Sequence, residues 1–115
     1  MSFPGTYSFS YYRGDSYGFI VRPKDSAGNA FDLVGYSAIM TIADTRGPSY
    51  GVQYTATAVV NEVDDIVTCT ITPTIGRHLD PATSWVYDLQ ITNGAEIYTI
   101  LTGTISTTDD VTGAV

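Results

Sequence analysis

The chain has 115 residues, of which 43% are hydrophobic and 15% are charged, so it has enough apolar residues for the core of one domain and too many for a disordered chain. Its formal net charge is −7 and its few basic residues are scattered, which argues against nucleic acid and anionic membrane as partners. No apolar run approaches the roughly 20 residues that cross a bilayer, and the start of the chain is not that of a signal peptide. The single cysteine, Cys69, excludes an internal disulfide and a cysteine-based zinc site, and it is typical of assembly in a reducing cytoplasm.

The first half of the chain is predicted to form short strands. Its β-branched and aromatic residues, with 9 tyrosines in the whole chain, fit a pleated sheet, while 11 glycines and 5 prolines supply turns. The segment 23–29 is dense in turn residues and predicts a hairpin tip. Alternation of apolar and polar residues predicts strands over residues 6–12, 16–22, 30–33 and 37–43.

The second half continues the pattern after a loop over residues 44–51. Residues 73–79 can form a single helical turn, which Asp80 and Pro81 end, and Asn93-Gly94 is a strong hairpin signal. Further strands are predicted over residues 52–60, 66–72, 84–92 and 96–106. The side chains expected to face inward from the second and third of these strands are Val67, Cys69 and Ile71, then Trp85, Tyr87, Leu89 and Ile91. In the last strand, one face is expected to carry Ile97, Thr99, Leu101, Gly103 and Ile105, and the other Tyr98, Ile100 and Thr102.

About seven or eight short antiparallel strands with one buried face each predict an all-β fold, a two-sheet β-sandwich, with a small barrel as the rival. We expect a single domain over residues 1–108, followed by a flexible, acidic C-terminal tail over residues 109–115.

No catalytic residue is predicted. Gly47-Pro48-Ser49-Tyr50-Gly51 matches the G-x-S-x-G nucleophile pattern, but that mechanism needs a strand, a tight turn and a helix, with a histidine in reach. Here the segment is a loop between two predicted strands, and the only histidine, His78, adjoins a turn. Asp88 lies in a predicted strand on the face opposite Trp85 and Tyr87, and so small a sandwich has little room for a cleft, so a pair of catalytic carboxylates is not expected either.

No metal, cofactor or adhesion site is predicted. Arg13-Gly14-Asp15 is interpreted as a turn, because glycine and aspartate favour turns. Glu62, Asp64 and Asp65 can offer oxygen ligands to calcium, but they lack the spacing of an EF-hand and are interpreted as solvated turn acids, as is the pair Asp109-Asp110. Cys69 falls on an inward face, where it acts as a small hydrophobe.

The excess of tyrosine indicates a binding surface. Tyr87 and Tyr17 are expected in the core, but a domain of this size cannot bury all the others, and exposed tyrosine with little lysine is favoured at protein–protein contacts. Stacking on sugar rings is the alternative. The tyrosines in question are Tyr7, Tyr11, Tyr12, Tyr50, Tyr54 and Tyr98.

Five stretches follow one another in a recognisable order: YRGDS at 12–16, DSAGNA at 25–30, DLVGYSA at 32–38, LDPATSWVYDL at 79–89 and IYTILTG at 97–103. This order resembles the small immunoglobulin-like domains of tailed-bacteriophage virions, including the N-terminal domain of baseplate upper proteins and short tail proteins. The resemblance covers residues 12–108. The stretch from Leu79 to Tyr87 is also similar to the corner before a late strand in fibronectin-like sandwiches, with Trp85 as the aromatic anchor.

The resemblance implies an immunoglobulin-like sandwich and a non-enzymatic role in a virus particle, through contacts with other virion proteins or with further copies of the chain. With one domain and no fibre of its own, we expect a tail, baseplate or adaptor component assembled in the host bacterial cytoplasm. A capsid decoration or cement protein is the alternative within this class, and a carbohydrate-binding adhesion module is the alternative from another class.

Overall fold

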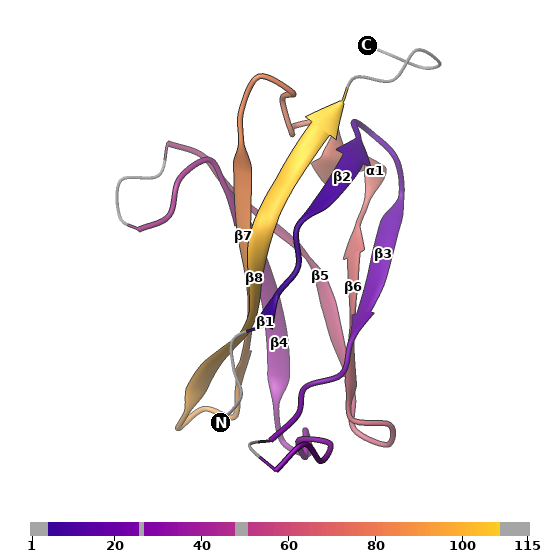
Figure 1. Ribbon diagram of the computed structural model, residues 1–115, viewed down its shortest axis with the longest axis vertical. Helices are drawn as coiled ribbons and strands as arrows, with labels where there is room; N and C mark the ends of the chain where they lie inside the picture. Colours follow the sequence, from indigo (N-terminus) through magenta and orange to yellow (C-terminus); the bar gives the residue numbers. More distant parts are fainter. Residues whose placement is uncertain (1–4, 26, 48–50, 109–115) are drawn as a thin grey trace.

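A computed structural model describes residues 5–25, 27–47 and 51–108 of the chain. These residues are mostly strand, with one short helix (Figure 1). The strands are β1 (Gly5–Thr6), β2 (Phe9–Tyr12), β3 (Tyr17–Val21), β4 (Ser37–Ala43), β5 (Gln53–Asn61), β6 (Ile66–Ile71), β7 (Trp85–Thr92) and β8 (Ile97–Thr108), and the helix is α1 (Pro73–Gly76).

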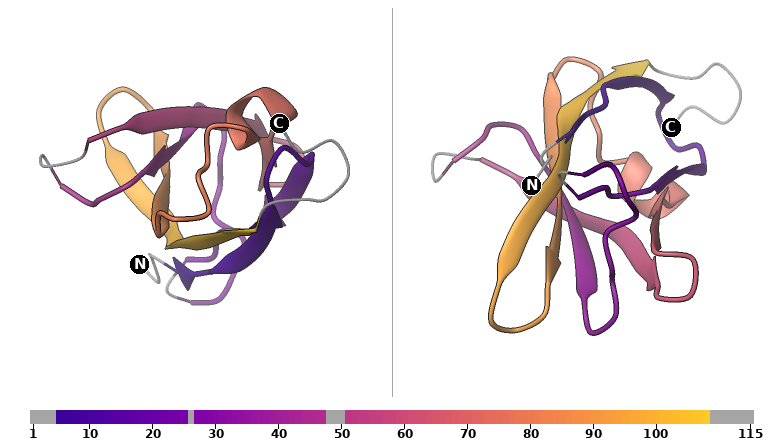
Figure 2. Two further views of the ribbon diagram at one scale, coloured as in Figure 1. Left: turned by 90° about the horizontal axis from the view of Figure 1, so that it is seen from above. Right: turned by 60° about the horizontal axis from the view of Figure 1, so that its bottom comes forward.

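All the strands belong to one strongly curled, mixed sheet that forms a half-barrel. Its order is β1-β8-β7-β4-β5-β6-β3, with β2 also paired to β8. β1 and β2 run parallel to β8, and every other described pair of strands is antiparallel. Seen along its length, the sheet wraps around the interior and leaves one side open (Figure 2).

The curl passes through β5. Residues 53–56 of this strand pair with β4, and residues 57–61 pair with β6. Because β5 carries the hydrogen bonding from one side of the interior to the other, the sheet is continuous. The all-β prediction is therefore confirmed, whereas the structure is not a clear two-sheet sandwich.

Two predicted strands differ from the structure. Residues 30–33 form no strand, and only an isolated bridge joins Ala30 to Lys24. The strand expected over residues 6–12 is divided into β1 and β2, because the chain leaves the ladder at Tyr7 and Ser8. There the Ser8 hydroxyl accepts a hydrogen bond from the Thr104 backbone N–H of β8 (3.1 Å), in place of a backbone carbonyl. The helical turn after Thr72 is confirmed, and Thr72 caps it by accepting from the Ile75 N–H.

The regular alternation predicted along β8 does not hold over its whole length. The pairing shifts by one residue, since Leu89 lies opposite Leu101 whereas Gln90 lies opposite Thr99, so that Ile100 is the extra residue of a β-bulge. A bulge reverses the alternation. After the bulge Leu101 and Ile105 are buried, whereas Ile97, which was predicted on the same face as these two, is exposed before it. Ile100 itself is buried.

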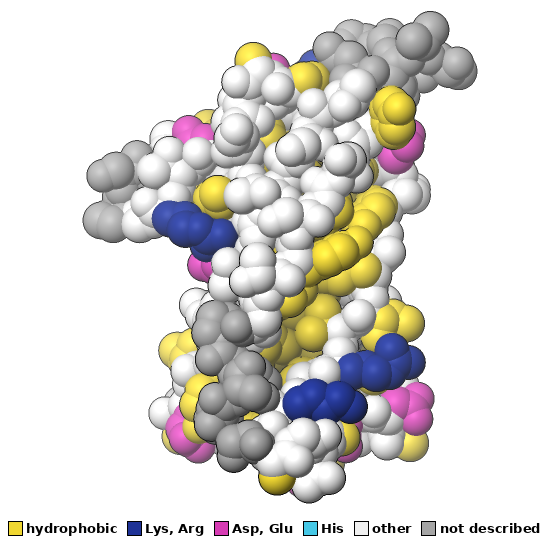
Figure 3. All heavy atoms as spheres, in the orientation of Figure 1, with side chains coloured by type: hydrophobic (Ala, Val, Ile, Leu, Met, Phe, Trp, Pro, Cys, Tyr) yellow, Lys and Arg dark blue, Asp and Glu magenta, His cyan; other side chains and the backbone are white. Residues whose placement is uncertain are grey.

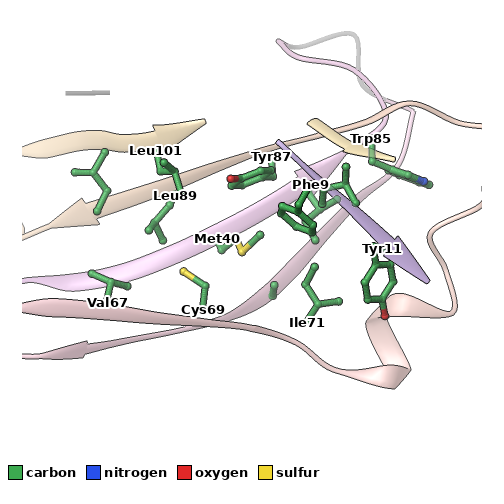
Figure 4. Packing of buried hydrophobic residues seen from close by; sticks show 14 of the residues in the cluster. Phe9, Tyr11, Met40, Val67, Cys69, Ile71, Trp85, Tyr87, Leu89 and Leu101 are labelled. Atoms are coloured by element: carbon green, nitrogen blue, oxygen red, sulfur yellow. The ribbon is translucent and has the colours of Figure 1, made fainter. Parts of the chain in front are cut away.

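The core fills the concave side of the half-barrel (Figure 4). Leu89, Leu101 and Val67 lie toward one end of this core, whereas the rings of Phe9, Tyr11 and Trp85 lie toward the other end, together with Ile71. The inward positions predicted for β6 and β7 are all confirmed as buried. Apolar burial of this kind stabilises the fold by roughly 25 cal/mol for each Å² removed from water.

Candidate functional site

The open side of the half-barrel is the most distinctive surface of the molecule. β3 ends the sheet at one edge, while β1 and β2 form the other, and we call the boundary between them the seam. Within residues 5–25, 27–47 and 51–108, no backbone pairing joins β3 to β1 or β2. A strand with an unpaired edge presents N–H and C=O groups that can pair with another chain.

Aromatic rings close one half of the seam. Phe9 stacks on Tyr17 with ring centroids 4.6 Å apart and planes 13° apart, and Tyr7 packs against Phe19 at 5.4 Å. The hydroxyls of Tyr7 and Tyr17 share a hydrogen bond of 2.6 Å across the seam. Desolvation, followed by this hydrogen bond, raises the pKa of Tyr17 to about 12. Side chains alone thus join the two edges here.

The other half of the seam is hollow. A cavity of about 370 Å³ opens to the surface there, and its walls are mainly apolar. Figure 3 shows it as a strip of hydrophobic side chains with basic side chains near its lower end. The residues that line it are Tyr7, Phe19, Ile20, Val21, Arg22 and Leu101.

Contacts behind the hollow fix the position of Tyr7. The Tyr87 hydroxyl donates a hydrogen bond of 2.5 Å to the Tyr7 carbonyl oxygen, and burial raises the pKa of Tyr87 well above its ordinary value. The Tyr7 N–H donates to the Thr102 carbonyl (2.9 Å). The edge formed by β1 is therefore held against β8, and the hollow lies between this edge and β3.

Arg22 gives the hollow its charge. Its side chain is exposed, and it makes no hydrogen bond or ion pair with the residues that the structure describes. By contrast, Arg46 is fully engaged, with Nη1 2.6 Å from Asp88 Oδ1 and Nη2 donating to the Gly103 carbonyl (3.0 Å). A cation without a partner, on a chain of net charge −7, attracts an acidic group.

The residues weighed for catalysis are not brought together in the described part of the chain. Ser49 lies outside the described residues. The His78 ring stacks on Tyr54 (5.2 Å, 17°), and Asp88 pairs with Arg46 on the outer face of β7. The expectation that Asp88 is exposed or bonded to a neighbour is confirmed, since its side chain is 41% exposed in that pair.

The acids of the turn over residues 61–65 have a structural role that the sequence did not indicate. Glu62 Oε2 accepts a hydrogen bond from the Gly35 N–H, and Asp65 Oδ1 accepts one from the Leu33 N–H, both at 3.0 Å. The prediction that these acids are only solvated is therefore wrong for Glu62 and Asp65. Both carboxylates hold the loop that precedes β4. No group of three or more histidine, cysteine or acidic side chains suited to a metal occurs among the described residues, and Asp109-Asp110 lies outside them.

Two other interpretations are confirmed. Arg13, Gly14 and Asp15 form a turn in which the Asp15 N–H donates to the Tyr12 carbonyl (3.0 Å) and Gly14 has a φ of 86°. Cys69 is fully buried in β6, and burial raises the pKa of its thiol to about 12.

The surplus tyrosines are divided between core and surface. Tyr11 is buried against α1, whereas Tyr7 and Tyr12 are exposed, at 39% and 58%. Tyr54 and Tyr98 are half-buried, and Tyr50 lies outside the described residues. Tyr7 was one of the tyrosines that indicated a binding surface, whereas Tyr17 was expected in the core and is only half-buried at the seam. Nothing in the sequence showed that β1 and β3 face each other.

Neither a protein-family model nor a curated protein sequence matches the chain. Its resemblance to phage virion domains stays an expectation drawn from the sequence. None of the described helical residues make up a segment of the length and apolarity that a membrane crossing requires.

Proposed function

We propose that this chain is a structural protein of a bacteriophage virion, a tail, baseplate or adaptor component that acts through protein–protein contacts and not by catalysis. It is assembled in the host bacterial cytoplasm and enters the particle in several copies. The observation that carries the proposal is the seam, where two strand edges that are unpaired within the described part of the chain flank an apolar hollow. Edges of this kind pair with other polypeptides, and apolar patches on a surface mark contact sites.

The proposal includes an immunoglobulin-like arrangement whose two sheets are joined through β5. In immunoglobulin domains, strands B, E and D are neighbours in one sheet, and C, F and G in the other. Here β3, β6 and residues 57–61 of β5 follow the first order, while β4, β7 and β8 follow the second. The strand order supports this assignment, and the curl of the sheet hides the division.

The corner before β7 supports the same assignment. Immunoglobulin-like domains often carry an aromatic side chain near the start of strand F that bonds to backbone a few residues earlier. Trp85 is the first residue of β7, and its Nε1–H donates to the Asp80 carbonyl at 3.0 Å. Asp80 also accepts from the Ala82 N–H through its side chain (2.9 Å), which fixes the turn.

The direct test is to locate and count the chain in intact particles of the phage that encodes it. Quantitative mass spectrometry against the major capsid protein gives the copy number, and cryo-electron microscopy gives the position. We expect a small copy number that follows the symmetry of the tail. Absence from purified particles would reject the proposal.

The same count decides the alternative of a capsid decoration or cement protein, which requires hundreds of copies spread over the head. A carbohydrate-binding module would instead need exposed aromatic rings in a row along one sheet face. The rings at the seam stack on one another, as Phe9 does on Tyr17, which favours the protein-contact proposal.

A further inference from the structure

The hollow in the seam lies between two strand edges, as the site for an added strand does. It is bounded by β3, whose outer edge is unpaired among the described residues, and by β1, which is paired on its other side to β8. Its apolar walls come from both edges, from Phe19 and Val21 on one and Tyr7 on the other, with Leu101 as the floor. Pairing of a peptide with such an edge takes affinity from main-chain hydrogen bonds and specificity from alternate side chains.

We propose that the hollow receives the segment 109–115 of a second copy of this chain, so that copies associate head to tail. This inference rests on the proposed function, which requires several copies in one particle. It deepens that function by naming the occupant of the seam.

Charge favours this occupant. The segment reads Asp-Asp-Val-Thr-Gly-Ala-Val, with two acids followed by small and apolar residues. Asp109 and Asp110 complement Arg22, which has no partner among the described residues. Val111, Gly113 and Val115 share one face of an extended strand, since side chains alternate with a period of two.

Direction favours the segment of a second copy over the chain's own. β8 runs on from Leu101, at the hollow, to Thr108, a rise of roughly 23 Å at about 3.3 Å per residue. The chain's own segment would therefore have to turn back along β8 to reach the hollow, whereas a neighbouring copy placed beyond Thr108 receives it without such a reversal.

The polarity of the strands fits a head-to-tail contact. β1 runs parallel to β8, while β3 runs in the opposite direction and ends at Val21, next to Arg22 (Figure 1). The segment 109–115 continues β8 of one copy and enters the hollow of the next copy with its acids at that copy's Arg22. In the hollow it runs parallel to β1 and antiparallel to β3 of the receiving copy. The two surfaces in this contact differ, and contacts of that type build rings or filaments.

The first experiment is binding of a fluorescent peptide of residues 107–115 to the purified full-length chain, followed by anisotropy. We expect saturable binding that weakens with added salt. Arg22→Glu should weaken it at least about tenfold, because an attractive pair becomes repulsive, and a peptide with Asp109→Lys and Asp110→Lys should recover binding to that variant. Arg77→Glu, which makes the same charge change on the residue that follows α1, is the matched control and should bind as the parent chain does.

The second experiment tests the head-to-tail arrangement by mixing two variants of the full chain. Arg22→Glu retains the segment and loses the hollow, whereas Asp109→Asn with Asp110→Asn retains the hollow and removes the acids that pair with Arg22, without complementing a glutamate at position 22. Analytical ultracentrifugation should show each variant as a monomer, and the mixture as a one-to-one dimer that does not grow further. Circular dichroism establishes that both variants are folded.

Three outcomes would overturn the inference. One is the absence of peptide binding by the folded parent chain, and another is self-association that the mixed variants fail to restore, which would mean a symmetric contact elsewhere. The third is binding that appears only after removal of residues 1–4, which would assign the hollow to those residues. If the peptide does not bind but the chain is found in phage particles, this inference fails and the proposed function stands. If the peptide binds but the chain is absent from particles, the proposed function fails and the head-to-tail contact stands.

Discussion

Gly103 of β8 lies so close to Tyr7 that a Cβ atom at this glycine would be 1.9 Å from the Tyr7 carbonyl oxygen. The same oxygen accepts the hydrogen bond from the Tyr87 hydroxyl, and Tyr87 lies opposite Gly103 in the β7–β8 pair. The missing side chain therefore makes room for the edge of the seam that β1 supplies, and the hydroxyl of Tyr87 holds it there.

The first prediction concerns this close approach. Gly103→Ala should lower the free energy of unfolding by about 3 kcal/mol, because Tyr7 must move away and the buried Tyr87 hydroxyl loses its acceptor. Urea denaturation followed by Trp85 fluorescence measures it. Gly18→Ala in β3 is the control, since a Cβ there meets the Cys69 carbonyl oxygen at 3.4 Å and Thr70 Oγ1 at 3.9 Å, and it should change stability by less than about 0.5 kcal/mol. Equal losses in the two variants would contradict the steric explanation.

The second prediction concerns the corner at Trp85. Trp85→Phe should cost about 2 kcal/mol, because the Asp80 carbonyl loses its donor and the smaller ring leaves a gap in the core. Since Trp85 is the only tryptophan, circular dichroism replaces fluorescence as the readout. Tyr54→Phe is the control: its ring packs 5.9 Å from Trp85, and its hydroxyl has no partner among the described residues. It should remain within about 0.5 kcal/mol of the parent chain.

The parts of the fold that could be predicted are those where one strand buries one face. β6 and β7 alternate without interruption, so Cys69 and Tyr87 were placed inward from the sequence alone. The helical turn that begins at Pro73 and the hairpin after Thr92 are local signals and were predicted as well. In these elements the short-range pattern and the tertiary contacts agree.

The parts that could not be predicted depend on contacts between distant segments. The bulge at Ile100 shifts the alternation in β8 by one residue, and no local signal distinguishes Ile100 from its neighbours. The parallel pairing of β1 with β8 depends on Gly103, a residue 98 positions after Gly5 in the sequence. The seam follows from that pairing together with the curl through β5, so the sequence indicated its tyrosines but not their location.

The third prediction concerns Cys69 and alkaline pH. Burial raises the pKa of its thiol to about 12, whereas an unfolded thiol ionises near 8.5. Above about pH 9 the unfolded chain therefore binds fewer protons than the folded one. The free energy of unfolding should fall as the pH rises from about 9 to about 12, and below that range Cys69 should not change it. Denaturation at a series of pH values should show a shallower fall for Cys69→Val than for the parent chain. The remaining slope comes from tyrosines such as Tyr17, whose pKa is also raised to about 12.

A thiol reagent gives an independent check of the same state. At about pH 8 the folded chain should not react with a disulfide reagent, because the thiolate is the reactive form and the sulfur is fully buried. Denaturant should expose one reactive thiol per chain. Rapid reaction without denaturant would contradict the burial of Cys69.

The last prediction concerns Arg46, which ties the loop after β4 to β7 and β8. One guanidinium nitrogen pairs with Asp88 (2.6 Å), and the other donates to Thr102 Oγ1 (3.2 Å) and the Gly103 carbonyl (3.0 Å). A lysine ammonium cannot form this fork, so Arg46→Lys should cost about 1 kcal/mol although the charge is kept. Asp88→Asn removes the charge but keeps an acceptor, and it should cost less, since the pair is 45% and 41% exposed and water weakens it. If the loss of stability in Arg46→Lys disappeared at high salt, and Asp88→Asn lost as much stability as Arg46→Lys, the result would contradict this explanation. The ion pair with Asp88, and not the two-pronged hydrogen bonding of the guanidinium, would then hold the loop.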